Sequence, residues 1–297
     1  MAWLLQALSG LVRLLPLRAA LGLGAGLGWI WYHLIPVRRR VARDNLRRAL
    51  PELPPAARRR IARHCYGQLA RSAIELLRLP GLDRRRVEAL IEHEGLEHLE
   101  RARAAGRGVI AVSAHFGSFD LLACAEALRG LPIHAVSRSQ HQPGVNRFWM
   151  RVRCRTGLGL LPAERSAWRI GRLLKKGEIV ALVIDQHMPP GRGIPVPFFG
   201  RPAATTTAPA ALALASGAPL LPVSIERLPA GRHRVRIEPP VPVHPDGDRP
   251  AEIERITRAL NAWLERRILQ RPDHWLWIHR RWKLDGPAAD ADGGRRR

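Results

Sequence analysis

Short apolar runs rich in β-branched residues alternate with segments of helical periodicity between residues 106 and 241, and this alternation constrains the fold more than any other feature. Runs of strand character occur at 106–115, 178–186 and 218–227. An amphipathic segment that ends in a glycine, 119–130, is typical of the stretches between them. Because such alternation favours a mainly parallel central sheet flanked by helices, we expect an α/β fold of that kind. A chain of 297 residues fits one such domain with helical additions.

The first 35 residues are apolar and contain only two basic side chains, Arg13 and Arg18. Residues 19–35 lack Lys, Arg, Asp and Glu, and as one helix they would span about 26 Å, slightly less than a hydrocarbon core of about 30 Å. A tilted transmembrane span and an interfacial helix both remain open. We therefore expect a membrane-associated helix at 1–35, a main domain at 36–284 and a disordered tail at 285–297.

The net charge of +24 at pH 7 is concentrated directly after the apolar segment, where residues 38–63 contain ten arginines and two acids. Basic segments beside a membrane helix face the cytoplasm and attract anionic headgroups. We therefore expect the main domain at the cytoplasmic face of a membrane with an anionic surface. A non-catalytic basic protein that binds nucleic acid is the alternative from another class, but the sequence contains no recognition motif, so we do not expect nucleic acid as a partner.

Cysteine and histidine spacing gives no sign of a metal centre. The three cysteines, Cys65, Cys124 and Cys154, lack CxxC spacing, and Asp185 and His187 have no third ligand at a recognisable distance in the chain. We therefore expect no metal and no disulfide framework.

Two other patterns mix charge with apolar residues. Arginines alternate over residues 151–155 of a predicted helix, and we expect them to be largely solvated. Trp275, Trp277 and Trp282 alternate with basic residues near the carboxyl terminus. This second segment could face a membrane or close an active site, or its indoles could simply be packed in the core.

A histidine and an acid, His115 and Asp120, stand five residues apart where the strand-like run 106–115 gives way to a helix. Ligands of open α/β sheets bind beyond the carboxyl ends of the strands, and Gly117 allows a sharp turn there. In this geometry Asp120 can accept a hydrogen bond from one imidazole nitrogen, which leaves the other nitrogen as a general base. Backbone N–H groups at 117–119 could then stabilise an oxyanion.

Three interpretations of the pair remain open at this point. His115 could deprotonate a substrate hydroxyl that attacks a thioester directly. Ser113, two residues earlier on the same strand face, could instead carry an acyl group, although no G-x-S-x-G elbow is present. The third interpretation is a buried histidine that the acid merely satisfies.

The sequence AHFGSFD (114–120) resembles the HX4D/E motif of membrane-associated acyltransferases, and the wider chain is similar to the late acyltransferases of bacterial lipid A biosynthesis. The similar segments follow the family's order over residues 35–283: RDNLRRALPEL (43–53), Glu75, VIDQH (183–187), PVPFFGRPA (195–203) and HWLWIHRRWK (274–283).

The resemblance implies an inner-membrane enzyme without a cofactor, which moves a fatty acyl group from acyl carrier protein, or acyl-CoA, to a hydroxyl of a phosphorylated lipid acceptor. It implies His115 as the general base and Asp120 as its partner. It also implies Arg138 near the acceptor phosphate or the thioester oxygen, and it places Asp185 at the acid that closes the strand before Gln186. Substrate contacts for Asp185, Phe199 and Arg201 remain one interpretation of the residues. The alternative is that Asp185 is a turn residue and that Phe199 and Arg201 belong to an ordinary packed turn.

One departure from the family pattern affects the acceptor. The lipid A enzymes usually carry Trp-Glu where this chain has Phe119-Asp120. A lysophospholipid, an aminolipid or a glycolipid therefore remains an alternative acceptor to a lipid A precursor.

Overall fold

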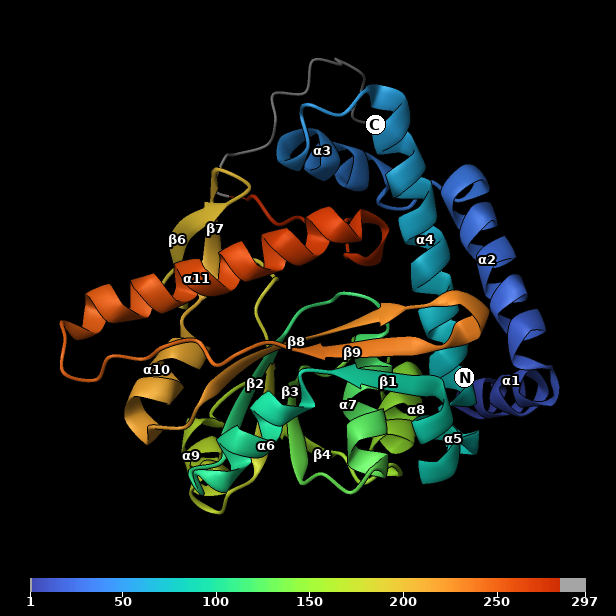
Figure 1. Cartoon of the computed structure of the whole chain (residues 1–297). Coiled ribbons are helices and arrows are strands. Elements are labelled where there is room, and N and C mark those ends of the chain that lie inside the picture. Colours follow the sequence, from blue (N-terminus) through green and yellow to red (C-terminus); the bar gives the residue numbers. More distant parts are fainter. Residues whose placement is uncertain (1, 284–297) are drawn as a thin grey trace.

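A seven-stranded sheet in the order β1-β9-β8-β2-β5-β3-β4 forms the centre of the molecule, which a computed structural model describes for residues 2–283 (Figure 1). Neighbouring strands are parallel except β8 and β9, which a short turn joins as an antiparallel pair. The expected α/β class is therefore confirmed. The strands are β1 (Ile91–Glu94), β2 (Val109–Ser113), β3 (Ile133–Ser137), β4 (Gly159–Pro162), β5 (Ile179–Val183), β8 (Leu220–Arg227) and β9 (His233–Ile237).

Helices cover both faces of this sheet because successive strand residues point to opposite sides. Val109 of β2 packs in one cluster with helices α5 to α8, whereas Ile110 and Val112 pack in another with α9 to α11. These helices are α5 (Arg84–Leu90), α6 (Leu96–Ala104), α7 (Phe119–Leu128), α8 (Pro143–Cys154), α9 (Ala167–Lys175), α10 (Ala208–Ser216) and α11 (Arg249–Gln270). An antiparallel hairpin, β6 (Gly193–Phe198) and β7 (Arg201–Thr206), stands outside the main sheet.

The amino-terminal segment forms two helices, α1 (Ala2–Leu14) and α2 (Leu17–Leu34), rather than the single helix expected from the sequence. Pro16 separates them, since proline lacks the amide hydrogen that would continue a helix. Helix α2 packs against α4 (Pro55–Arg78), and a Cβ at Gly28 would lie 2.6 Å from Gly67 Cα. The glycines of α2 thus permit a very close helix contact.

No single helix among residues 2–283 has the length and apolar character needed to cross a membrane, although α2 and α3 (Arg39–Ala49) together do, with a bend of 92° between them. Most exposed large apolar side chains of the described residues nevertheless lie on α1, on α2 and in the short segments that follow these two helices. They are Trp3, Leu4, Leu8, Leu11, Leu14, Leu15, Leu23, Leu27, Trp29, Ile30, Leu34, Ile35 and Val37.

The tryptophan-rich segment near the carboxyl terminus is part of the core. Trp275, Trp277 and Trp282 are all buried, in a cluster with residues of α3, α4 and α11 and with Phe198 of the hairpin. Packed indoles, one of the interpretations left open by the sequence, are therefore confirmed, and Trp275 in addition contacts the site described below. The expected disordered tail lies outside the described residues.

Candidate active site

Two adjacent parallel strands, β2 and β5, bring His115 and Asp185 together at the carboxyl edge of the sheet. Ser113 pairs with Val183 in register, and each strand continues two residues further to one member of the pair. His115 Nδ1 lies 2.8 Å from Asp185 Oδ1, and the His115 backbone N–H donates to Oδ2 over 3.0 Å. Asp185 therefore fixes both the ring and the backbone of His115.

Asp185 is ionised in this environment although it is buried. Burial by itself raises the pKa of the carboxyl, but the charge and hydrogen bonds of His115, with the indole N–H of Trp275 donating over 2.9 Å, lower it to about 2. Burial lowers the pKa of His115, but the Asp185 carboxylate outweighs it and the Asp120 charge adds to the same effect, so that the pKa lies above 6.5.

The second imidazole nitrogen of His115 is the one available for chemistry. The side-chain amide of Gln186 lies 3.3 Å from Nε2 and can donate to it. When the ring is neutral, the bond to Asp185 holds the proton on Nδ1 and leaves the lone pair on Nε2. The side chain of His115 is 15% exposed and lines a cavity, so this lone pair is accessible.

The partner that the sequence suggested, Asp120, does not bond to the imidazole. Its Oδ2 accepts a hydrogen bond from Trp149 Nε1 over 3.1 Å, and its Oδ1 lies 3.3 Å from the Nε of Arg153. Both partners are on α8, and Arg153 is buried, where it needs a counter-charge. The predicted hydrogen bond between His115 and Asp120 is therefore wrong, because α8 attracts the carboxylate that begins α7.

The turn between β2 and α7 is as sharp as the sequence predicts. Gly117 has a φ of +60°, and a Cβ there would lie 2.0 Å from the carbonyl oxygen of Ile225. Its N–H donates to the carbonyl oxygen of His274 over 2.9 Å. This amide is therefore engaged and differs from the free oxyanion donor that we expected at 117–119.

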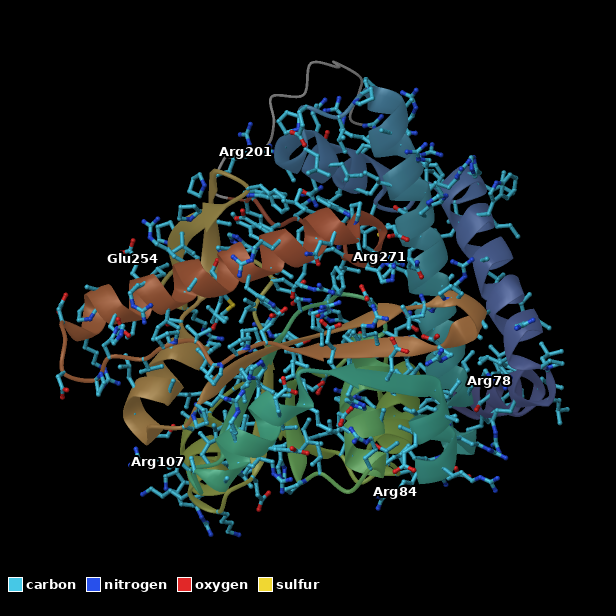
Figure 2. The ribbon with its side chains drawn as sticks, in the orientation of Figure 1. Arg78, Arg84, Arg107, Arg201, Glu254 and Arg271 are labelled. Atoms are coloured by element: carbon cyan, nitrogen blue, oxygen red, sulfur yellow. The ribbon has the colours of Figure 1, made fainter. Side chains whose placement is uncertain are left out.

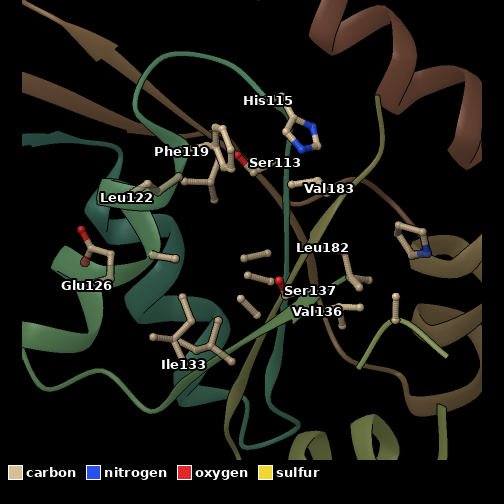
Figure 3. Close-up of a pocket in the computed structure, with 18 of the residues that line it drawn as sticks. Ser113, His115, Phe119, Leu122, Glu126, Ile133, Val136, Ser137, Leu182 and Val183 are labelled. Atoms are coloured by element: carbon tan, nitrogen blue, oxygen red, sulfur yellow. The ribbon is translucent and has the colours of Figure 1, made fainter. Parts of the chain in front are cut away.

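A largely apolar cavity with a volume of about 320 Å³ opens beside His115 and runs between the sheet and α7 (Figure 3). Figure 3 shows Phe119 and Leu122 reaching into it from α7, with Ile133 farther from the imidazole. Its lining includes Val109, the first residue of β2, which precedes His115 in the chain by six residues, or about 20 Å of extended chain. The cavity is thus elongated along the strands.

Glu126, two helical turns beyond Phe119 on α7, is a charged residue in the wall of this cavity. It is buried and lies 2.7 Å from His93 Nε2 and 2.9 Å from the guanidinium of Arg129. Because its carboxylate is satisfied by these partners, Glu126 interrupts the apolar lining without an unpaired charge.

The other predicted site residues differ in whether they line the cavity beside His115. Arg138, directly after β3, is exposed and lines the same cavity, and Ser113 lines it too. Phe199 and Arg201 lie at the turn of the β6–β7 hairpin, and neither contributes to this lining. The backbone N–H of Phe199 donates to Glu265 of α11. Among the described residues, no group of three potential ligands could hold a metal ion.

Three residues of the site were missed by sequence reasoning, Gln186, Trp149 and Arg153, whereas Trp275 belongs to the segment for which an active-site contact was one of the interpretations. Gln186 directly follows Asp185, so its position after a strand was a usable signal. Arg153 was expected to be solvated, but it is only 5% exposed, donates to the Ser137 hydroxyl and lies 4.6 Å above the Trp149 ring. No local pattern distinguishes it from its exposed neighbours.

Comparisons with known proteins agree on one enzyme family. The profile described as "Bacterial lipid A biosynthesis acyltransferase" matches residues 1–284. The chain is 29% identical to a lipid A biosynthesis lauroyltransferase of Escherichia coli (strain K12) over 286 residues, which are 95% of this chain and 91% of that protein. Identity is 28% to a palmitoleoyltransferase of the same organism, covering 88% and 90% of the two chains. A phosphatidylinositol mannoside acyltransferase of Mycobacterium tuberculosis is 27% identical, covering 82% and 77%.

Proposed function

The chain belongs to the bacterial lipid A biosynthesis acyltransferase family, and from this premise we propose that it transfers a fatty acyl group from an acyl thioester to a hydroxyl group of a lipid A precursor. The family makes it an acyltransferase that acts on a lipid acceptor. The observation that carries the finer proposal is the imidazole of His115, which Asp185 orients at the mouth of an elongated apolar cavity.

The reaction begins with His115 as general base. Nε2 takes the proton of the acceptor hydroxyl while the hydroxyl oxygen attacks the thioester carbonyl carbon. The imidazolium that forms is stabilised by the carboxylate of Asp185, whose pKa is lowered to about 2. When the carbon–sulfur bond breaks, the leaving thiolate takes the proton from Nε2, and the products are an ester and a free thiol.

Direct transfer is favoured over an acyl-serine intermediate. Ser113 lines the cavity, but among the described residues its hydroxyl is not hydrogen-bonded to His115, whose Nδ1 is engaged by Asp185. A serine nucleophile needs a base within hydrogen-bond reach. The imidazole is therefore better placed to activate an incoming hydroxyl.

The acyl chain of the donor occupies the cavity between the sheet and α7. Its walls are mostly aliphatic, and each buried methylene contributes about 0.8 kcal/mol of favourable transfer free energy. Arg138 at the lining is then close to the thioester end of the donor. Acyl carrier protein is the proposed donor, since a chain with a net charge of +24 attracts an acidic protein, and acyl-CoA, whose phosphates the same charge attracts, is the alternative.

The enzyme works at the cytoplasmic face of the inner membrane. The exposed apolar side chains of α1 and α2 would rest in the bilayer, and the arginines that follow at 38–63 would contact anionic headgroups. This arrangement keeps the catalytic sheet beside the surface from which a lipid acceptor must be taken.

A different lipid acceptor is the second candidate, because a phosphatidylinositol mannoside acyltransferase also matches most of the chain. Phe119 and Asp120 stand where the lipid A enzymes usually have Trp and Glu, which is consistent with such a change. The non-catalytic nucleic-acid-binding protein is wrong, since the matching family consists of acyltransferases.

Lipid mass spectrometry of a deletion strain tests the proposal. Loss of one acyl chain from lipid A, restored by the wild-type gene and not by His115→Ala, is the expected result. The His115→Ala protein should remain in the membrane fraction at wild-type level. Loss of an acyl chain from another lipid would transfer the proposal to that acceptor, and full complementation by His115→Ala would refute the base mechanism.

A further inference from the structure

A second cavity, with a volume of about 1110 Å³, opens between the α2–α3 corner and the segment 279–283. We call it the basic pocket, and it is defined by six cationic side chains: Arg38, Arg39, Arg40, Arg43, Arg280 and Lys283. No Asp or Glu contributes to its lining. Among residues 2–283, no carboxylate forms an ion pair with Arg38, Arg40, Arg280 or Lys283.

Part of this charge is fixed in place by the surrounding structure. Arg39 donates to the backbone oxygen of Tyr32 over 2.9 Å, and the guanidinium groups of Arg39 and Arg43 lie about 6 Å above the Tyr32 ring. Arg38 has a φ of +61°. This left-handed conformation is uncommon for residues other than glycine and costs free energy. Unbalanced, partly immobilised cations around a cavity are a ready binding site for an anion.

The basic pocket and the acyl cavity share a wall. His279 lines the basic pocket, and its Nε2 accepts a hydrogen bond from the backbone N–H of His187 over 3.0 Å. His187 lines the cavity that contains His115. Burial, with the nearby cations, lowers the pKa of His279 to about 4, so the ring is neutral and can accept this bond at neutral pH. A ligand held in the basic pocket is therefore separated by this pair of histidines from the cavity that His115 lines.

The chemistry of the pocket selects a phosphate. Arginine presents paired N–H donors that match phosphate oxygens, and several such groups can neutralise a dianion. The exposed apolar residues Leu34, Ile35 and Val37 end directly before Arg38, so lipid chains and a charged headgroup would meet at this corner. An anion attached to a lipid suits this combination better than a free anion.

We infer that the basic pocket binds a phosphate group on the head of the acceptor lipid and thereby presents the acceptor hydroxyl to His115. This inference rests on the proposed acyl transfer and adds a subsite to it. Arg138, which lines the acyl cavity, is then left to the donor side of the reaction.

The test compares one acceptor in two forms, a phosphorylated lipid and the same lipid after removal of its phosphate by a phosphatase. We expect Arg280→Gln/Lys283→Gln to raise KM for the phosphorylated form by about tenfold or more, with kcat little changed, since charge-assisted hydrogen bonds are lost. KM for the dephosphorylated form should not change. Arg38→Asn, which keeps a residue that tolerates the left-handed conformation, should act in the same direction.

The matched control is Arg84→Gln/Arg107→Gln, which removes the same charge from exposed positions on the opposite side of the molecule (Figure 2). It should leave KM for both acceptors unchanged. Equal KM effects on both acceptors, or a rise in KM only for the acyl donor, would overturn the inference while wild-type activity still supports acyl transfer. If the wild-type enzyme acylates neither acceptor, the proposed function itself fails.

Discussion

Two buried carboxylates in this protein each have a histidine as partner, but their surroundings differ. Asp185 bonds to His115 at the edge of the sheet, and Glu75 of α4 bonds to His233 of β9 over 2.9 Å in the interior. The pKa of each carboxyl is raised by burial and lowered further by its partners, to about 2 in both cases. His115, the partner of Asp185, is 15% exposed and lines a cavity. His233, the partner of Glu75, is only 1% exposed.

The second difference lies in the other partners of the two acids. Arg227 donates two hydrogen bonds to Glu75, over 3.1 and 2.6 Å, and a third to Gln68, so the charge is balanced by a permanent cation. Asp185 has no hydrogen bond from an arginine or lysine among the described residues, and the neutral indole of Trp275 takes that place. The Glu75 network thus fastens α4 to β8 and β9, while the charge of Asp185 remains available to stabilise an imidazolium that forms during the reaction.

The largest effect should come from Asp185→Asn. An amide can donate to His115 Nδ1, which would move the ring proton to Nε2 and remove the base, and the corresponding change in a catalytic triad costs about 10⁴-fold in kcat. We expect kcat to fall by about 10³- to 10⁴-fold while circular dichroism stays as in the wild type. A variant with more than a tenth of the wild-type kcat would show that Asp185 does not orient the base.

The equivalent change in the interior, Glu75→Gln, should affect stability rather than chemistry. It leaves Arg227 buried without its counter-charge, which typically costs about 3–5 kcal/mol of unfolding free energy. We expect a lower midpoint of thermal unfolding, with kcat of the folded enzyme within a few-fold of wild type. A large loss of kcat without loss of stability would show that Glu75, like Asp185, acts in the reaction rather than in the stability of the fold.

The pH dependence of stability sharpens this prediction. Because the pKa of Glu75 is depressed from 4.5 to about 2, its contribution is complete above about pH 4.5 and is lost as the pH falls toward 2. The difference in unfolding free energy between wild type and Glu75→Gln should therefore be largest at pH 7 and smaller at pH 3. Denaturant unfolding at the two pH values measures it, and an unchanged difference would contradict the assigned pKa.

The central part of the fold could be predicted from the sequence because its elements have strong local signals. The runs that became β2, β5 and β8 are apolar over a full strand length, and glycine marks the ends of several helices. Strands β1 and β4 were missed because each has four residues and no clear periodicity. The β6 strand was missed because its two prolines are typical of a loop.

The site shows the limit of local reasoning more clearly. His115 was identified because it follows a strand, but its partner was sought five residues away when it lies 70 residues further along the chain. Strand adjacency is set by the packing of the whole sheet, and no short segment encodes it. Asp185 also follows a strand by two residues, so the equivalence of the two positions could have indicated the pair once β2 and β5 were assumed to be neighbours.

The smallest expected effect on activity is that of replacing Asp120, which among the described residues has no histidine partner in hydrogen-bond contact, unlike Asp185 and Glu75. Asp120 contacts α8 rather than the imidazole, yet its charge contributes to the raised pKa of His115. Since the base must be neutral, kcat/KM should increase with pH through a pKa above 6.5 in the wild type. Asp120→Asn removes a negative charge, so this pKa should decrease. Because the base itself is retained, kcat at its optimum should fall about tenfold or less, below the about 10²- to 10⁴-fold that a general base contributes.

Trp149→Phe is the matched control for that variant, because it removes a hydrogen bond to Asp120 and leaves every charge in place. Its pH profile should coincide with that of the wild type. If Asp120→Asn instead lost as much activity as Asp185→Asn, with no shift in the profile, Asp120 would have to contact the imidazole during turnover. In that case α8 would have to release the carboxylate, and the ion pair between Asp120 and Arg153 would be a resting arrangement rather than the reactive one.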